Sequence, residues 1–121
     1  VSEVLELVGL GDVQKKKPGG FSLGMGQRLG LAGAILADPK VLLLDEPAGG
    51  LGAQDIEWMN GLIHNLATHC SVILVEHHMD VVLGLADRIA VLNFGELLIC
   101  DRPEKVTANP IVQNAYLGVG L

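Results

Sequence analysis

Hydrophobic residues follow two spacings along this chain, and their alternation predicts its secondary structure. Uninterrupted aliphatic runs of strand length occur at 41–44, 72–75 and 89–92. Apolar residues recur at helical spacing over 24–37, 56–66 and 79–86. Strands that alternate with helices in this way predict right-handed β-α-β units, and therefore an α/β fold with a largely parallel sheet flanked by helices.

Turn signals complete the prediction at both ends of the chain. Apolar residues at helical spacing over 1–8 predict an opening helix, which Gly9 ends. The segment 93–96 predicts a hairpin turn into an antiparallel strand at 97–100. Pro103 predicts the start of another helix, and a break at 109–110 precedes a short final one.

The run 41–44 contains no polar residue and predicts a strand that is buried on both faces. Such strands are typical of parallel sheets covered by helices. The cysteines, Cys70 and Cys100, lie beside hydrophobic runs and have neither disulfide-framework nor metal-ligand spacing. We therefore expect both to act as small apolar residues in a reducing, cytoplasmic compartment.

Composition narrows the class of protein. With 121 residues, 50% of them hydrophobic and 18% charged, the chain is one domain or a piece of one, and intrinsic disorder is excluded. A net charge of -6 and only 3% aromatic residues argue against nucleic acid as a partner. No apolar stretch approaches the roughly 20 residues that span a bilayer, so we expect no direct membrane insertion. The chain starts at Val1 in helical sequence, which suggests that the front of a larger protein is missing.

Acid and base groups follow two of the aliphatic runs. Asp45 and Glu46 come directly after the first, and Glu76, His77 and His78 follow the second. In open α/β sheets, ligands bind beyond the carboxyl ends of parallel strands. A carboxylate there suits Mg2+, and a second one could accept a proton from an attacking water. Taken singly, Asp45 and Glu46 fit a solvated strand end somewhat better than a nucleotide site, and His77 fits a structural histidine better than a ligand.

The order of these motifs resembles that of a known family. A helix headed by Phe21 to Met25 is followed by the strand 41–44 with Asp45-Glu46-Pro47, then by Gly50-Leu51, and finally by Glu76-His77. This order resembles the signature loop, Walker B strand, D-loop and switch histidine of the nucleotide-binding subunit of ATP-binding cassette (ABC) transporters. The resemblance implies the C-terminal half of a P-loop NTPase. It further implies the end of a helical subdomain at 1–20, the motif-bearing core at 21–101 and a C-terminal tail at 102–121.

The resemblance also implies roles for single residues around ATP and Mg2+. Asp45 would hold the Mg2+ ion, Glu46 would be the general base, and His77 would contact the γ-phosphate. Ser22 and Gly24, at the positive end of a helix dipole, would bind the γ-phosphate of nucleotide held by a second ATPase subunit. Further implied partners are membrane permease subunits, so the chain would be peripheral to the inner membrane on its cytoplasmic side.

Two subfamilies compete for this sequence. The segment from His78 to Gly95 and the ending Tyr116-Leu117-Gly118 resemble the ATPase subunits of branched-chain amino acid importers. The segment 21–31 is more similar to ATPases of bacitracin-type peptide exporters. We favour the importer because the tail is longer and more specific.

The chain also departs from the family pattern. No G-x-x-x-x-G-K-[ST] phosphate loop occurs in it, Met25 replaces the usual glutamine, and Gly52 replaces the D-loop acid or amide. We therefore expect ATPase activity from a complete cassette and none from this chain alone. An alternative hypothesis is a non-enzymatic interaction module that pairs with a full-length cassette.

Overall fold

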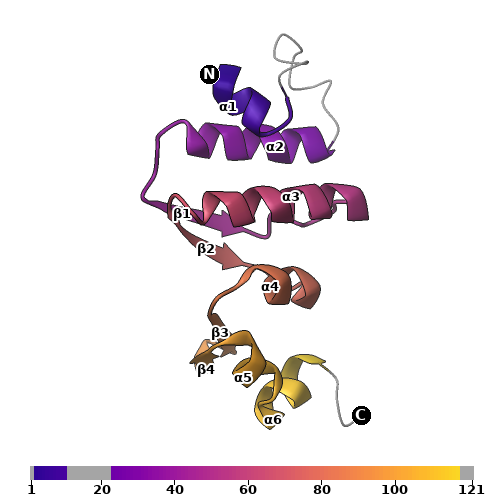
Figure 1. The fold of residues 1–121 in the computed structure, drawn as a ribbon. Helices are drawn as coiled ribbons and strands as arrows, with labels where there is room; N and C mark the ends of the chain where they lie inside the picture. The colour runs from indigo at the N-terminus through magenta and orange to yellow at the C-terminus, as the bar shows by residue number, and fades with distance from the viewer. Residues whose placement is uncertain (1, 11–22, 118–121) are drawn as a thin grey trace. The chain divides into compact units, whose positions relative to one another are not determined.

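The structure, a computed structural model, describes residues 2–10 and 23–117 and divides into two compact units, Val1–Val81 and Val82–Leu121. The first unit holds α1 (Ser2–Leu7), α2 (Leu23–Ile35), β1 (Val41–Asp45), α3 (Ala53–Leu66) and β2 (Ser71–Val75) (Figure 1). The second holds β3 (Ile89–Asn93), β4 (Glu96–Asp101), α5 (Pro103–Thr107), α6 (Pro110–Val112) and a π-helical turn, η3 (Gln113–Leu117). The boundary falls within α4 (Met79–Leu85).

Arg28 of α2 ties three elements of the first unit together. Its guanidinium lies 3.9 Å from the ring centroid of Trp58 in α3, and its Nη2 donates to Asp55 Oδ1 at 3.4 Å. Gly9, which ends α1 as predicted, has φ +75°, and a Cβ there would lie 2.8 Å from Arg28 Nη1. Its positive φ therefore favours glycine at position 9, and a larger residue would also require the end of the Arg28 side chain to shift.

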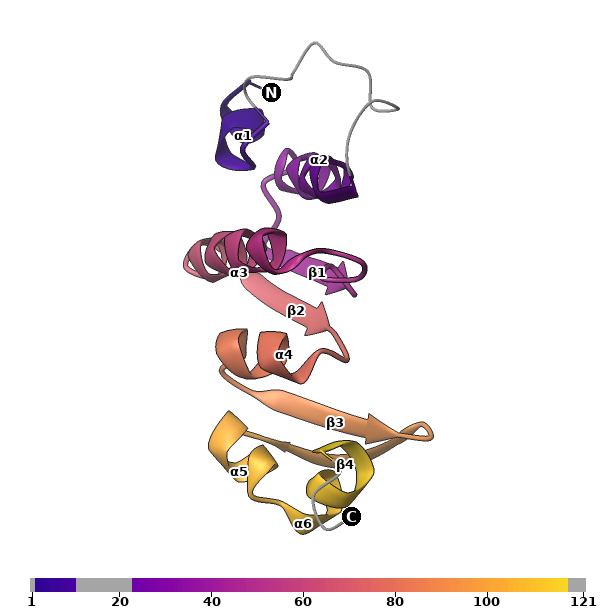
Figure 2. The same ribbon diagram turned by 90° about the vertical axis from the view of Figure 1, so that its right-hand side faces the viewer.

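Strands β1 and β2 form a parallel pair, as the aliphatic runs predict, with α3 alongside them (Figure 2). The expectation that β1 is buried on both faces is wrong, because its residues are alternately exposed and buried. Leu42 and Leu44 are buried, whereas Leu43 is 63% exposed and Ile73, its partner in β2, is 54% exposed. One face of the pair is thus left apolar and uncovered by the described residues.

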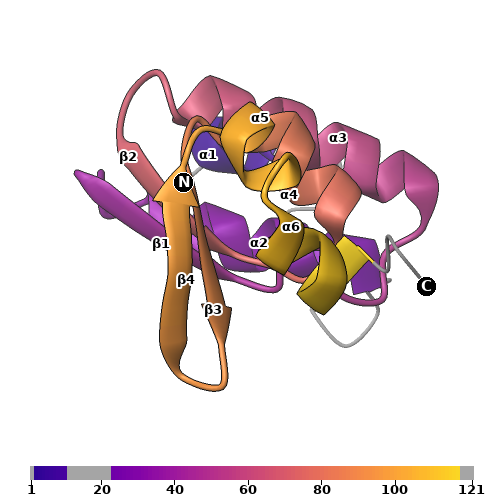
Figure 3. The ribbon, with the colours of Figure 1, turned by 90° about the horizontal axis from the view of Figure 1, so that it is seen from below.

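The hairpin of β3 and β4 organises the second unit (Figure 3). The strands pair antiparallel, and a bulge interrupts their register between Val91 and Leu92. Phe94 and Gly95 form the turn with φ of +49° and +80°. Two successive positive φ values match the right-handed twist of the strands and indicate a type I′ turn. The predicted hairpin is confirmed.

The core of the second unit lies between this hairpin and the helices after it. Four buried residues form that core: Ile89, Val91, Val106 and Val112. Pro103 begins α5, and Asn109 Oδ1 accepts from the backbone N–H groups of Ile111 and Val112, so the predicted break is an N-cap. The Tyr116 hydroxyl donates to the Leu92 carbonyl and joins η3 to β3.

The two cysteines differ from the prediction that both are small buried residues. Cys70 is only partly buried, and Cys100 is exposed on β4. Arg88 donates from Nη2 to the Cys100 carbonyl at 3.2 Å, so position 100 contributes a backbone acceptor to the edge of the hairpin. An apolar run does not reveal which of its faces the next residue occupies, and here the thiol lies on the exposed side.

The uncovered face of the β1–β2 pair predicts that this chain associates with itself when isolated. Replacing both Leu43 and Ile73 with Thr, which keeps strand propensity, should weaken self-association by at least about tenfold, since a buried Leu or Ile contributes about 1.5 to 3 kcal/mol. Sedimentation velocity over a concentration series measures this. Phe94→Asn removes a fully exposed aromatic side chain of the other unit and should leave self-association unchanged. A wild-type chain that stays monomeric at high concentration would contradict the prediction.

Candidate functional site

The carboxyl ends of β1 and β2 lie side by side and carry the predicted acid and base groups. Asp45, the last residue of β1, is the register partner of Val75, the last residue of β2. The Glu46 N–H donates to the Val75 carbonyl at 2.8 Å, so this contact extends one residue past β1. The strand ends therefore bring Asp45 and Glu46 close to His77, which follows two residues after Val75.

Glu46 and His77 contact each other directly. His77 Nδ1 lies 3.1 Å from Glu46 Oε1, and the two side chains are 67% and 57% exposed, respectively. An ionised carboxylate only accepts hydrogen bonds, so this contact requires a proton on Nδ1 of the imidazole. The ring is then oriented by Glu46, and its Nε2 is left for another partner.

The backbone at Glu46 is in the left-handed region, with φ +46°. This conformation costs a residue with a Cβ roughly 1 to 2 kcal/mol. The turn that follows is closed by the Gly49 N–H, which donates to the Glu46 carbonyl at 3.0 Å. Backbone strain at a residue whose side chain contacts a histidine from the neighbouring strand end is typical of functional sites.

Glu76 has a role that its position in the sequence did not reveal. The sequence suggests only a polar neighbour of His77, yet the Glu76 side chain is 0% exposed. Its Oε2 accepts the Ala48 N–H at 3.2 Å, and its Oε1 accepts the N–H groups of His77 and His78 at 3.0 and 3.4 Å. The one available signal is that Glu76 follows β2 as Glu46 follows β1.

Glu76, His77 and His78 could together hold a metal ion, since one ligand atom from each lies within 4.8 Å of the others. Both oxygens of Glu76, however, already accept backbone N–H groups. Three of the roughly four lone-pair sites of this carboxylate are therefore already occupied, which leaves little capacity for a metal. We assign no metal to this group.

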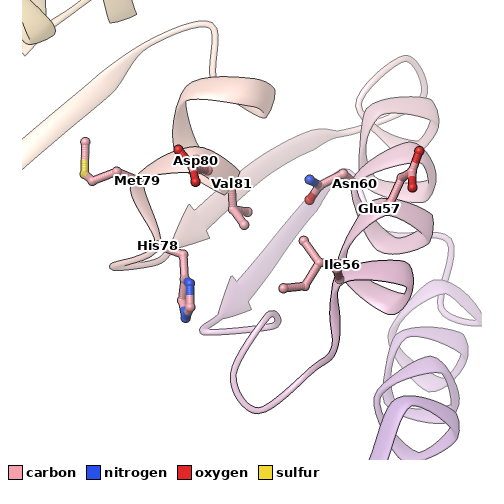
Figure 4. A pocket seen from close by; sticks show the side chains of 8 residues that line it. Ile56, Glu57, Asn60, His78, Met79, Asp80 and Val81 are labelled. Carbon is pink, nitrogen blue, oxygen red and sulfur yellow. The ribbon is translucent and has the colours of Figure 1, made fainter.

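A hollow of about 350 Å³ lies beside the site, between α3 and the start of α4 (Figure 4). His78 and Val81 face it from one side, and Ile56 and Asn60 of α3 from the other. Within the described ranges, the buried Asn60 Oδ1 has no hydrogen-bond partner. His78 is exposed, and its ring centroid lies 4.8 Å from that of His77.

The remaining predicted site residues are at the head of α2. Gly24 lies in the first turn of α2, whereas Ser22 lies outside the described residues. Gly52, at the departure from the D-loop pattern, is the N-cap of α3, with its carbonyl accepting from Ile56 N–H at 3.0 Å. A glycine cap offers no side-chain acceptor to the first turn of α3.

Comparison with known proteins agrees with the family resemblance of the sequence. The family model described as ABC transporter matches residues 1–49. LivG of Escherichia coli strain K12, a high-affinity branched-chain amino acid transport ATP-binding protein, is 37% identical over 116 residues, which cover 94% of this chain and 46% of LivG. BcrA of Bacillus licheniformis, a bacitracin transport ATP-binding protein, is 43% identical over 100 residues, covering 81% and 33%.

A solved structure agrees as well. The ADP conformation of an ATP-binding cassette of an ABC transporter gives a TM-score of 0.85 at 25% identity, and the match covers 96% of this chain and 48% of that one. The chain belongs to the ABC transporter family.

This ABC family chain spans about half the length of its curated relatives, 46% in the case of LivG. The structural match confirms the α/β fold expected for part of a P-loop NTPase. Within the described ranges, no helix of the chain has the length and apolar character that crossing a membrane requires.

The left-handed backbone at Glu46 predicts an unusual order of stability among its variants. The free energy of unfolding of Glu46→Gly should be about 1 kcal/mol higher than that of Glu46→Ala. Both variants lose the contact with His77, but only glycine relieves the backbone strain. Urea denaturation of the two variants measures the difference. The matched pair at Asp45, in regular strand, should show the opposite sign, with Ala more stable than Gly. Equal stability of the Glu46 variants would show that the backbone there is unstrained.

Proposed function

We propose that this chain is the part of an ABC ATPase that activates water and senses the γ-phosphate of ATP. The observation that carries this proposal is the contact between Glu46 and His77, whose Oε1 and Nδ1 atoms are 3.1 Å apart at the carboxyl edge of a parallel strand pair. Ligands of open α/β sheets bind at this edge. Both side chains are more than half exposed and can therefore reach a bound substrate.

Glu46 and His77 divide the chemistry between them. Glu46 acts as general base and orients and deprotonates the attacking water, for which it needs an accessible carboxylate. The Nδ1–H of His77 donates to the Glu46 carboxylate, so the ring presents its Nε2 to the γ-phosphate. When Nε2 is also protonated, the ring offers a donor and a positive charge to the transferring group.

Asp45 is the residue that would hold Mg2+. Its carboxylate is exposed at the end of β1, beside the substrate edge, and a single carboxylate with water ligands suits this ion. When bound, Mg2+ supplies neutralisation of phosphate charge. Asp45 is the last residue of β1, and Glu46 begins the turn that follows.

Ser22 and Gly24 serve the nucleotide of the other subunit in a dimer of cassettes. Gly24 lies in the first turn of α2, a helix of 13 residues whose N–H groups favour an anion at that end. The partners of the chain are thus a second ATPase subunit, identical or related, and the permease subunits under which the dimer docks. In this arrangement 1–20 closes a helical subdomain, 21–101 carries the core motifs, and 102–121 forms the tail.

Branched-chain amino acid import is the transport process that we propose. The similarity to LivG extends over 94% of the chain, which is enough to include at least part of the C-terminal tail. Export of a bacitracin-type peptide is the competing substrate class, because BcrA has the higher identity, 43%, over a shorter stretch. We favour import over export because the similarity to LivG covers more of the chain and the resemblance of the tail is specific to importers.

A second candidate function is that of a non-enzymatic module that pairs with a complete cassette. The observation in its favour is the sequence itself, which contains no G-x-x-x-x-G-K-[ST] motif. Calorimetry separates the two functions. On its own, the chain should bind ATP with Mg2+ only at about millimolar strength, and joining it to a phosphate-loop half should restore tight binding and turnover. A joined protein without turnover would favour the module.

Glu46→Gln in the joined cassette tests the role of the general base. The amide cannot take up the proton, so kcat should fall by at least about a hundredfold while ATP binding persists. Steady-state phosphate release and calorimetry measure these two quantities. Glu104→Gln, an exposed carboxylate on α5, should leave both unchanged. Unchanged turnover in Glu46→Gln would refute the assignment of the base.

A further inference from the structure

Glu76 is the one carboxylate near the site whose side chain is fully buried, among the residues that the structure describes. It lies between two backbone segments that carry the proposed catalytic pair. On one side is the turn after β1, where Ala48 is 1% exposed and its N–H meets Glu76 Oε2 at 3.2 Å. On the other is the segment after β2, where the N–H groups of His77 and His78 meet Oε1.

These bonds connect the two catalytic residues through a single side chain. Ala48 is two residues from Glu46, in the turn that the Gly49 N–H closes onto the Glu46 carbonyl. His77 is bonded to Glu76 by its own backbone N–H at 3.0 Å, and its Nδ1 lies 3.6 Å from the same oxygen. A movement of either segment would therefore stretch a bond to Glu76.

We propose that Glu76 is a positioning residue that fixes the turn bearing Glu46 against the backbone of His77. Its effect on turnover rests on the function proposed above, whereas its effect on the backbone does not. Strand register brings Glu46 and His77 to the same edge, and Glu76 adds a direct bond between the turn after β1 and the segment after β2, where the 3.1 Å contact otherwise joins two exposed side chains. Exposed ion pairs hold geometry weakly by themselves.

The chemistry of the bonds explains why a carboxylate is needed here. Three backbone donors converge on Glu76, and a carboxylate accepts them on two oxygens. A glutamine has one acceptor oxygen, and its amide N–H groups would face a backbone donor on the other side. Aspartate keeps both oxygens but is shorter by one methylene, so it cannot span both segments.

Hydrogen exchange measured by NMR on the 121-residue chain tests the backbone part of the proposal. Glu76→Gln should raise the exchange rate of the Ala48 amide, or of the His77 and His78 amides, by roughly tenfold or more, because one set loses its acceptor. Amides of the β3–β4 hairpin should exchange at the wild-type rate, as should all amides in Glu104→Gln. If Glu76→Gln does not fold, Glu76→Asp provides the same comparison. Unchanged exchange at positions 48, 77 and 78 would overturn the proposal.

A double-mutant cycle in the joined cassette tests the catalytic part. Glu76→Gln should lower kcat roughly tenfold with little change in the KM for ATP. In a His77→Ala background it should lower kcat by a clearly smaller factor, because there is no longer an imidazole for the Glu46 turn to be held against. A residue that only stabilises the fold would reduce kcat by the same factor in both backgrounds, and that result would overturn the proposal.

Amide exchange and turnover test different parts of the proposal, and each can contradict its own part independently. A joined cassette without any turnover would refute the proposed ATPase function, while the amide exchange rates would still decide whether Glu76 holds the two segments. Normal turnover in Glu46→Gln with raised exchange in Glu76→Gln would show that the connection exists but serves other chemistry.

Discussion

The parallel pairing of β1 with β2 is the constraint on which the candidate site depends. Because both strands run in the same direction, Asp45 and Val75 end the pair together, and the residues after them meet at one edge. A slip of one residue would turn each side chain to the opposite face of the pair. The contact between Glu46 and His77, 31 positions apart in the chain, is therefore set by strand register before any side chain contributes.

Strong local signals made most of the elements predictable from the sequence. Aliphatic runs, helical spacing, and the turn residues Gly9, Gly95 and Asn109 predicted the elements from α1 to the final helix, except that residues 11–22 lie outside the described part. The meeting of Glu46 and His77 was also predictable, since it needs only that both strands be parallel and end in polar residues. The roles assigned to Asp45, Glu46 and His77 remain predictions, as do those of Ser22, which lies outside the described residues, and Gly24.

Two features were not predictable, each for a physical reason. An aliphatic run shows that both faces of a strand can be buried, but not whether anything covers them, so the exposure of Leu43 and Ile73 required the structure. The burial of Glu76 depends on the Ala48 N–H, 28 positions away, and a backbone donor leaves no mark in the sequence. Side-chain patterns predict apolar contacts better than they predict bonds to the backbone of a distant turn.

Glu46 and Glu76 show how two identical side chains acquire different tasks from their surroundings. The two residues after paired strands are chemically equivalent, yet one is 57% exposed and the other has a side chain that is 0% exposed. Within the described residues, the exposed carboxylate contacts the imidazole of His77 and remains accessible to a bound molecule. The buried one has its lone pairs directed at backbone N–H groups, so releasing it for proton transfer would leave buried donors without partners, at a cost of about 1 to 3 kcal/mol each. Under the function proposed above, burial therefore gives Glu46 the chemistry of the site and Glu76 its geometry.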